Sequence, residues 1–153
     1  MLACSGWAFL FYFKSPQPVE QGAELTRDAY VTADMEFLMD ICGVERNRSG
    51  SAKAYYAIAP IGDQFVLVRF PASDYDALAE FESATQAYLA GTQRDLPFHM
   101  TVTGMSAEPG ETAAALLSSW FSDNVGWMER SGLIAEVDDH SVYLCPYMID
   151  TGS

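Results

Sequence analysis

Two histidines, His99 and His140, are the only side chains whose ordinary pKa lies near neutrality, so they are the natural candidates for acid–base catalysis. A hydrolase built on them would need a hydroxyl nucleophile against the imidazole and a carboxylate behind it. The sequence contains no G-x-S-x-G nucleophile motif, and Ser118 and Ser119 fall inside a predicted helix. No catalytic residue is therefore predicted. A hydrolase that uses His140 or His99 with a nearby acid stands as the alternative to a binding function.

Three potential metal ligands, Asp138, Asp139 and His140, follow one another in a predicted turn. Neighbouring residues rarely direct their side chains at one ion, and no second set of ligands accompanies them. Asp and His are also common turn residues, so a solvated turn is the favoured interpretation and a weak divalent site the alternative. The sequence has no glycine-rich phosphate-binding loop, and no cofactor is predicted.

The binding residues predicted from the sequence are Arg46, Arg48 and Lys53. They lie in one polar loop, residues 46–53, and make up three of the eight Lys and Arg residues of the chain. A basic loop on an acidic domain could contact an acidic partner or a headgroup, and the loop between the first two strands of an OB-like barrel is a usual place for ligand contact. The alternative is an ordinary solvated loop.

Composition limits the classes of partner. The chain has 153 residues, enough for one domain, and 50% of them are hydrophobic, which supports a real core. Its net charge of −13 repels phosphate backbones, so nucleic acid is not a predicted partner. Three cysteines are too few for a disulfide scaffold. Cys42 and Cys145 could pair outside the cytoplasm, although buried free thiols are the favoured interpretation.

Residues 1–16 form an apolar N-terminal segment that is rich in aromatic side chains. They are too few to span a bilayer, which takes about 20 apolar residues, and they lack the basic start of a signal peptide. We interpret the segment as the remnant of a membrane anchor. The alternatives are a strand or helix packed on the core and, from Leu2-Ala3-Cys4, a lipoprotein processing site. Residues 17–29 are predicted to be a linker and entry segment, and residues 30–153 a single acidic α+β domain.

Hydrophobic periodicity predicts the elements of that domain. Residues 30–45 alternate approximately between the two faces of one long strand with a bend or bulge at Gly43, and a helix over residues 34–41 is the alternative. Residues 54–59 and 64–70 form a hairpin, and residues 98–105 another strand. Helices are predicted from Ser73 to Gly91 and from Pro109 to Gly132, the second with a break at Gly126. Residues 133–137 and 141–149 are predicted to form a closing hairpin.

This order of elements predicts an α+β fold, with a small, mostly antiparallel sheet or a partly open OB-like barrel and two helices. The apolar start followed by AYVTADMEFL, YYAIAP, FVLVRFP and MTVTGM resembles uncharacterised bacterial membrane-anchored proteins with an OB-like extracytoplasmic module. The resemblance covers residues 1–105 and supplies no catalytic residues. It implies a membrane-associated protein with a soluble domain outside the cytoplasm, and a cytoplasmic location is the alternative.

The predicted function is a non-catalytic binding or interaction module, tethered to a membrane through its N-terminal segment. Its partner would be a protein or a small molecule, and contact with the membrane is predicted only through residues 1–16. The long strand over residues 30–45 also offers an edge through which copies of the chain could pair into a homo-oligomer.

Overall fold

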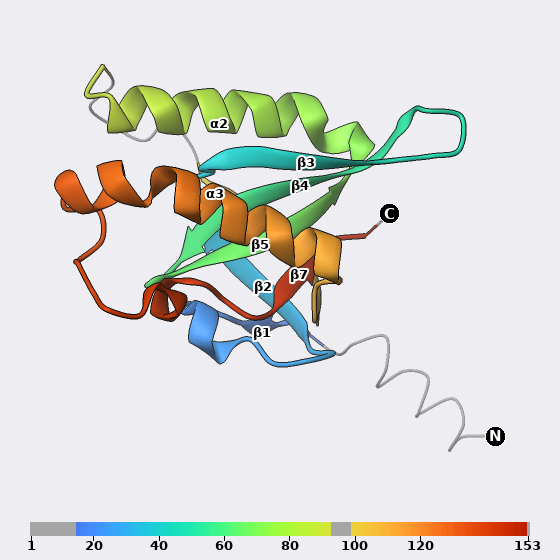
Figure 1. The fold of residues 1–153 in the computed structure, drawn as a ribbon. Coiled ribbons are helices and arrows are strands. Elements are labelled where there is room, and N and C mark those ends of the chain that lie inside the picture. Colours follow the sequence, from blue (N-terminus) through green and yellow to red (C-terminus); the bar gives the residue numbers. More distant parts are fainter. Residues whose placement is uncertain (1–14, 93–98, 153) are drawn as a thin grey trace.

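The structure is a computed structural model that describes residues 15–92 and 99–152 (Figure 1). Its strands are β1 (Gln17–Pro18), β2 (Tyr30–Met35), β3 (Asp40–Arg46), β4 (Ala52–Ile61), β5 (Gln64–Pro71), β6 (Met100–Ala107) and β7 (Met148–Asp150). The long helices are α2 (Tyr75–Leu89) and α3 (Glu111–Arg130), and the short 3₁₀ helices are η1 (Gly22–Glu24), η2 (Ala72–Asp74) and η3 (His140–Tyr143). No helix in these residues is both long and apolar enough to cross a bilayer.

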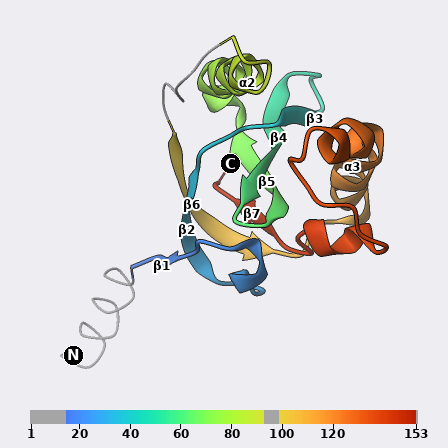
Figure 2. The same ribbon diagram turned by 90° about the vertical axis from the view of Figure 1, so that its left-hand side faces the viewer.

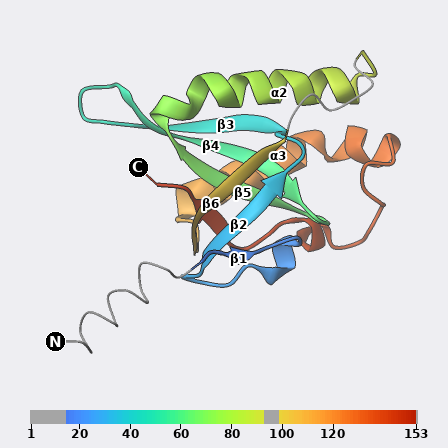
Figure 3. The same ribbon diagram turned by 180° about the vertical axis from the view of Figure 1, so that it is seen from behind.

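All strands belong to one sheet with the order β1-β2-β6-β7-β5-β4-β3. The sheet is mixed: β1 is parallel to β2 and β5 to β7, while the other four neighbouring pairs are antiparallel. It curls so that β2 and β6 face β4 and β5, but it stays open (Figure 2). Figure 3 shows β2 and β6 crossing in front of β5. The predicted α+β class with two long helices is confirmed, and a relation to OB barrels stays a prediction.

Two hydrophobic cores lie on opposite faces of the curled sheet. The first fills the inside of the curl, where α2 adds Leu78 and Phe81 to the buried side chains of β2, β4 and β5. The second lies between α3 and the outer face of β4 and β5, and includes Leu117 and Trp120. Residues 65–70 of β5 are all buried, because successive side chains of a strand point to opposite faces and both faces are covered here.

Both long helices end at the glycines that the sequence predicted. Gly91 after α2 and Gly132 after α3 each have a φ of +78°, the left-handed conformation that favours glycine. The N–H of the next residue donates to a carbonyl five residues back, at 3.0 Å after α2 and 2.9 Å after α3. Each of these hydrogen bonds belongs to a Schellman motif, in which the residues after a helix donate to its last carbonyls. The predicted break at Gly126 is wrong, because α3 runs through it from Glu111 to Arg130.

The prediction of one long strand over residues 30–45 is also wrong. The segment divides into β2, which pairs with β6, and β3, which pairs with β4. Leu38 is fully buried, and its position breaks the period-two alternation of Val31, Ala33 and Met35. Its N–H donates to Thr85 Oγ1 on α2 at 2.9 Å, so a helix contact replaces the strand ladder where the chain crosses between the two parts of the sheet.

The closing hairpin predicted over residues 133–149 does not form. Residues 133–139 lie outside the regular elements, residues 140–143 form η3, and only Met148–Asp150 make a strand. That strand, β7, lies between β5 and β6 and joins the two parts of the sheet. A three-residue strand carries too little periodicity to be recognised in the sequence.

Arg69 on β5 holds this junction together. Its side chain is 10% exposed, Nε donates to Glu45 on β3 at 3.0 Å, and Nη1 donates to Asp150 on β7 at 3.2 Å. Nη1 also donates to the Gly152 carbonyl at 3.2 Å. One guanidinium therefore connects three strands, and its charge is paired where it is buried.

The outer edge of β3 is partly covered. The Ile41 N–H donates to the Glu82 carboxylate of α2 at 2.6 Å. The pKa of Glu82 is raised above its ordinary value, mainly because the carboxyl is partly buried and also because Asp40 lies nearby. The hydrogen bond from Ile41 offsets part of this rise. Register shifts between Ile41 and Gly43 and after Glu45 also bulge the strand. Bulges and covered donors discourage pairing between sheet edges.

The N-terminal residues that the structure describes pack against the sheet. Val19 and Leu25 belong to the first core and are 4% and 3% exposed. Residues 1–14, most of the predicted apolar segment, lie outside the described residues.

Candidate functional site

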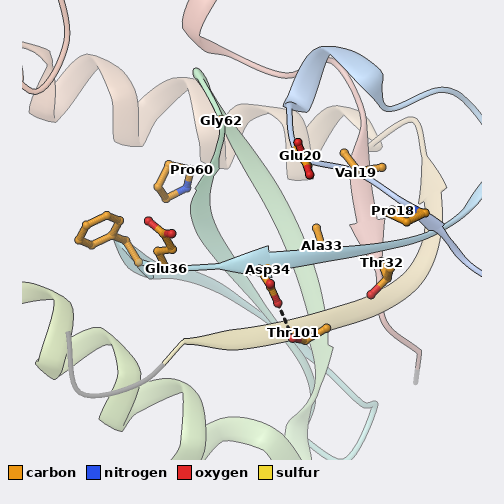
Figure 4. Close-up of a pocket in the computed structure, with 11 residues that line it drawn as sticks. Pro18, Val19, Glu20, Thr32, Ala33, Asp34, Glu36, Pro60, Gly62 and Thr101 are labelled. Atoms are coloured by element: carbon orange, nitrogen blue, oxygen red, sulfur yellow. Dashed lines mark hydrogen bonds between the residues drawn. The ribbon is translucent and has the colours of Figure 1, made fainter.

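Two hollows meet at the end of the molecule where β4 turns into β5. The first, called here the acidic hollow, has a volume of about 650 Å³. Glu20 reaches it from the segment after β1, Asp34 and Glu36 reach it from β2 and the residues that follow, and Pro60 and Gly62 lie across from β2 (Figure 4). All three carboxylates are exposed.

The second hollow, called here the apolar hollow, has a volume of about 610 Å³. Its lining includes Gly62 and Asp63 of the β4–β5 turn, Leu89 at the C-terminal end of α2, and Leu133 just after α3. Several of its lining side chains are large and apolar: Phe37, Met39, Leu89, Leu133, Val142 and Tyr143. Apolar side chains exposed together at a hollow are typical of a binding surface.

The two hollows share Phe37, Pro60 and Gly62 in their linings, so they adjoin at these three residues. We refer to the pair as the groove. One half of it carries negative charge and the other half is hydrophobic. A ligand that fills both halves must therefore combine an apolar part with a positively charged or hydrogen-bond-donating part.

The turn between β4 and β5 is fixed in place from outside the hairpin. Gly62 has a φ of +62°, which favours glycine, and a Cβ atom there would lie 2.0 Å from Gln21 Oε1 and displace that amide. The same Gln21 oxygen accepts a hydrogen bond from the Asp63 N–H at 3.0 Å. The segment after β1 thus braces the turn that separates the two hollows.

The helix ends position the apolar half of the groove. The Schellman motif at Gly132 brings Leu133 out of the helix with its side chain 43% exposed, while Ile134 is 8% exposed. Tyr143 Oη both donates to the Ala135 carbonyl and accepts from the Ala135 N–H, each at 3.0 Å. These bonds hold residues 133–135 against η3, which contributes Val142 to the hollow.

His99 lies beside the acidic hollow, but its neighbours are not arranged as a catalytic triad. Its Nδ1 lies 3.8 Å from Asp34 Oδ1, and both side chains are well exposed. The Thr101 hydroxyl donates to the same carboxylate, as Figure 4 shows. In a catalytic triad the nucleophile donates to the imidazole rather than to the carboxylate, so Thr101, Asp34 and His99 are not connected as a triad.

His140 and the predicted metal turn are engaged in local contacts. His140 Nε2 lies 3.6 Å from Glu129 Oε2. Asp139 Oδ1 accepts from the Ser141 hydroxyl at 2.7 Å and from its N–H at 3.0 Å, and these bonds lower the pKa of Asp139. Asp138 and Asp139 thus lie just before η3, with Asp139 capping it, and His140 is the first residue of η3. Within residues 15–92 and 99–152, no group of three or more acidic, histidine or cysteine side chains is placed to hold a metal ion.

The structure places Arg46, Arg48 and Lys53 in and beside the β3–β4 loop, at the opposite end of the molecule from the groove (Figure 1). Arg46 Nη1 donates to the Gly50 carbonyl at 2.9 Å, and Lys53 Nζ lies 3.8 Å from Glu45 Oε1. These two side chains thus make contacts within their own hairpin. A ligand at this loop stays a prediction.

The two described cysteines are free and lie in different cores. Cys145 Sγ donates to the Gly22 carbonyl at 3.3 Å, and Cys42 Sγ to the Tyr56 carbonyl at 3.5 Å. Burial raises the pKa of both thiols, that of Cys42 to about 12. Neither thiol has the lowered pKa of a nucleophile or of a reactive redox cysteine. Cys4 lies outside the described residues.

No family model, no curated protein and no solved structure matches this chain. The candidate site is therefore defined by geometry alone. The sequence patterns around these residues predict other positions for them: Asp34 and Phe37 in a long strand, Gly62 in a hairpin turn, and Leu133 and Val142 in a closing hairpin. Only the folded chain brings these five positions to one place.

Proposed function

We propose that this chain is a non-catalytic binding module that takes a segment of a partner protein in the groove. The observation that carries the proposal is that an acidic and an apolar hollow adjoin at Phe37, Pro60 and Gly62. The apolar hollow would bind hydrophobic side chains of the segment, and the acidic hollow would favour Lys or Arg beside them. The net charge of −13 supports the same choice, because it favours encounters with basic partners.

In this proposal residues 1–16 tether the module to a membrane, and the domain faces the extracytoplasmic side as an OB-like module, as the sequence resemblance implies. Pairing of two copies through β3 is a separate prediction, and the bulges and the Glu82 contact at that edge disfavour it. A hydrolase stays the alternative: each histidine lies near a carboxylate, His99 at 3.8 Å from Asp34 and His140 at 3.6 Å from Glu129, but the Thr101 hydroxyl beside His99 donates to Asp34 rather than to the imidazole.

The binding proposal can be tested by selecting from a random peptide display library on the immobilised full-length chain. We expect enriched peptides to carry apolar residues next to Lys or Arg. Their affinity should fall by about tenfold or more for Val142→Asp, because the carboxylate would have to be buried under the peptide. Val44→Asp is the matched control, since Val44 is similarly exposed, at 40% against 51%, but lies on β3 away from the groove.

Two results would contradict the proposal. Selection could enrich no common sequence, or the enriched peptides could bind the Val142→Asp and Val44→Asp variants with equal affinity. A lipid or small-molecule ligand would show the first result, because the apolar hollow would then have no preference among peptides.

The tether can be tested by flotation of the full-length chain with phosphatidylcholine vesicles. We expect the chain to float with the vesicles and a variant with Phe9→Asp and Phe11→Asp to stay behind, because a charge is costly in the acyl region. The uncharged vesicle surface removes electrostatic attraction as a cause. If both proteins stay behind, the tether is wrong, while the binding proposal is unaffected.

A further inference from the structure

The outer edge of β2 is covered over only half of its length. β1 pairs with it through Gln17 opposite Val31 and Pro18 opposite Thr32. The Val19 N–H then donates to the Thr32 carbonyl at 2.9 Å, after which the chain leaves the sheet and enters η1. From residue 33 onward, β2 has no strand beside its outer edge in the part of the chain that the structure describes.

The hydrogen-bonding alternation of β2 shows which backbone groups this leaves free of a strand partner. The Ser106 N–H donates to the Ala29 carbonyl at 2.8 Å, so the odd-numbered residues of β2 face β6. The even-numbered residues face the outer edge, as the bond from Val19 to Thr32 shows. The next residue in that series is Asp34, whose N–H and C=O therefore point toward the acidic hollow that it lines.

The walls of the acidic hollow suit an extended chain. Pro60, across from β2, has no N–H and so presents no competing donor. Glu20, Asp34 and Glu36 surround the space, and among the described residues no Lys or Arg forms an ion pair with any of them. A segment lying there would meet an open strand edge on one side and negative charge around it.

We propose that the partner segment binds as an added strand, in line with β1 and paired with the outer edge of β2 at Asp34. This inference rests on the proposed function and names the conformation and chemistry of the occupant. The occupant is an extended segment of a partner protein with one or two Lys or Arg residues that face Glu20, Asp34 and Glu36. Its apolar end passes Phe37, which lines both hollows, and enters the apolar hollow. Strand addition gives affinity through the backbone, and the flanking pockets give specificity.

The test measures backbone pairing directly, with the tightest peptide from the display selection as the probe. Bound to the full-length chain, the peptide should protect the Asp34 amide from hydrogen exchange by about tenfold or more, because a strand bond must open before exchange. Single N-methylation at successive peptide positions should weaken binding by about three- to tenfold at alternate positions only. A peptide bound as a helix, or through side chains alone, would leave Asp34 exchange unchanged and show no alternation.

A second set of variants tests whether the carboxylates of the acidic hollow favour Lys or Arg in the bound segment. Glu36→Gln and Asp34→Asn keep the side-chain shape and one acceptor oxygen but remove the charge, so both variants should fold. Each should weaken binding of the basic peptide by about threefold to tenfold at low salt. Glu80→Gln, on the exposed side of α2 and outside both hollows, should leave affinity unchanged.

The outcomes separate the two proposals. If peptides bind and Val142→Asp weakens them, but Asp34 exchange, N-methylation and the charge variants have no effect, the proposed function survives and strand addition is refuted. If selection yields no peptide, both proposals fail together.

Discussion

Replacing Arg69 with methionine removes the guanidinium that connects β3, β5 and β7. The group makes three hydrogen bonds of 3.0 to 3.2 Å, to Glu45, Asp150 and the Gly152 carbonyl. Methionine keeps an unbranched apolar stem of similar length, so the substitution tests the polar contacts more than the packing.

The expected loss follows from the exposure of the partners. Truncating one member of a buried ion pair costs about 3–5 kcal/mol when the other charge stays buried. Here Glu45 and Asp150 are 38% and 39% exposed, so water can solvate them once Arg69 is gone. We therefore expect about 3 kcal/mol, the lower end of that range. For a chain of this size the melting temperature should fall by about 6–12 °C.

Equilibrium urea unfolding of the full-length chain, followed by circular dichroism, measures this loss. Arg48→Met is the matched control, because Arg48 is exposed in the β3–β4 loop and its removal should change stability by less than about 0.5 kcal/mol. A loss below about 1 kcal/mol for Arg69→Met, similar to a surface pair, would refute the argument that this side chain secures β7.

Three further substitutions or reactions test other parts of the structure. Gly62→Ala should lower stability more than Gly50→Ala, because both positions have positive φ but only at Gly62 would the Cβ displace the Gln21 side chain. Thermal unfolding of the two variants compares them. The raised pKa of Glu82 means that the folded state binds its proton more tightly, so wild-type stability falls as pH rises from the ordinary value of 4.5 through the raised value. The Glu82→Gln variant should therefore gain stability relative to wild type as pH rises across that window. Urea unfolding of both proteins at several pH values measures this, and a stability difference that does not change with pH would contradict the raised pKa. In a Cys4→Ser chain, Cys42 should react with a maleimide at pH 8 roughly a thousandfold more slowly in the folded state than in the urea-unfolded state. The reason is that its pKa is about 12 in the folded chain against an ordinary 9.0. Equal rates in the two states would contradict the buried position of this thiol.

Local signals account for what the sequence predicted correctly. Gly91 and Gly132 end the helices because their backbone conformation is one that other residues avoid. The β4–β5 hairpin was recognised from two short apolar runs around a turn that contains Gly62. Each of these features depends on neighbouring residues, so a single sequence contains the information.

The errors and the missed site depend on distant residues. Leu38 leaves the strand pattern because Thr85, on α2, accepts its N–H. The groove combines β2, the β4–β5 turn, both helix ends and η3. No spacing along the chain indicates that Asp34, Gly62 and Leu133 will be neighbours. Leu133 and Val142 could have been suspected only as apolar residues in irregular segments, which is a common pattern.

The position of β7 has a consequence for the order of folding. The β4–β5 hairpin closes over a few residues, whereas Arg69 and Asp150 are 81 residues apart. Contacts between distant residues form slowly, because the entropy of loop closure must be lost before they stabilise the chain. The hairpin can therefore form early, while the β1-β2-β6 and β3-β4-β5 parts become one hydrogen-bonded sheet only when Met148–Asp150 insert between them. A chain in which β7 has not inserted leaves the facing edges of β5 and β6 open to other strands, and such unpaired edges favour aggregation.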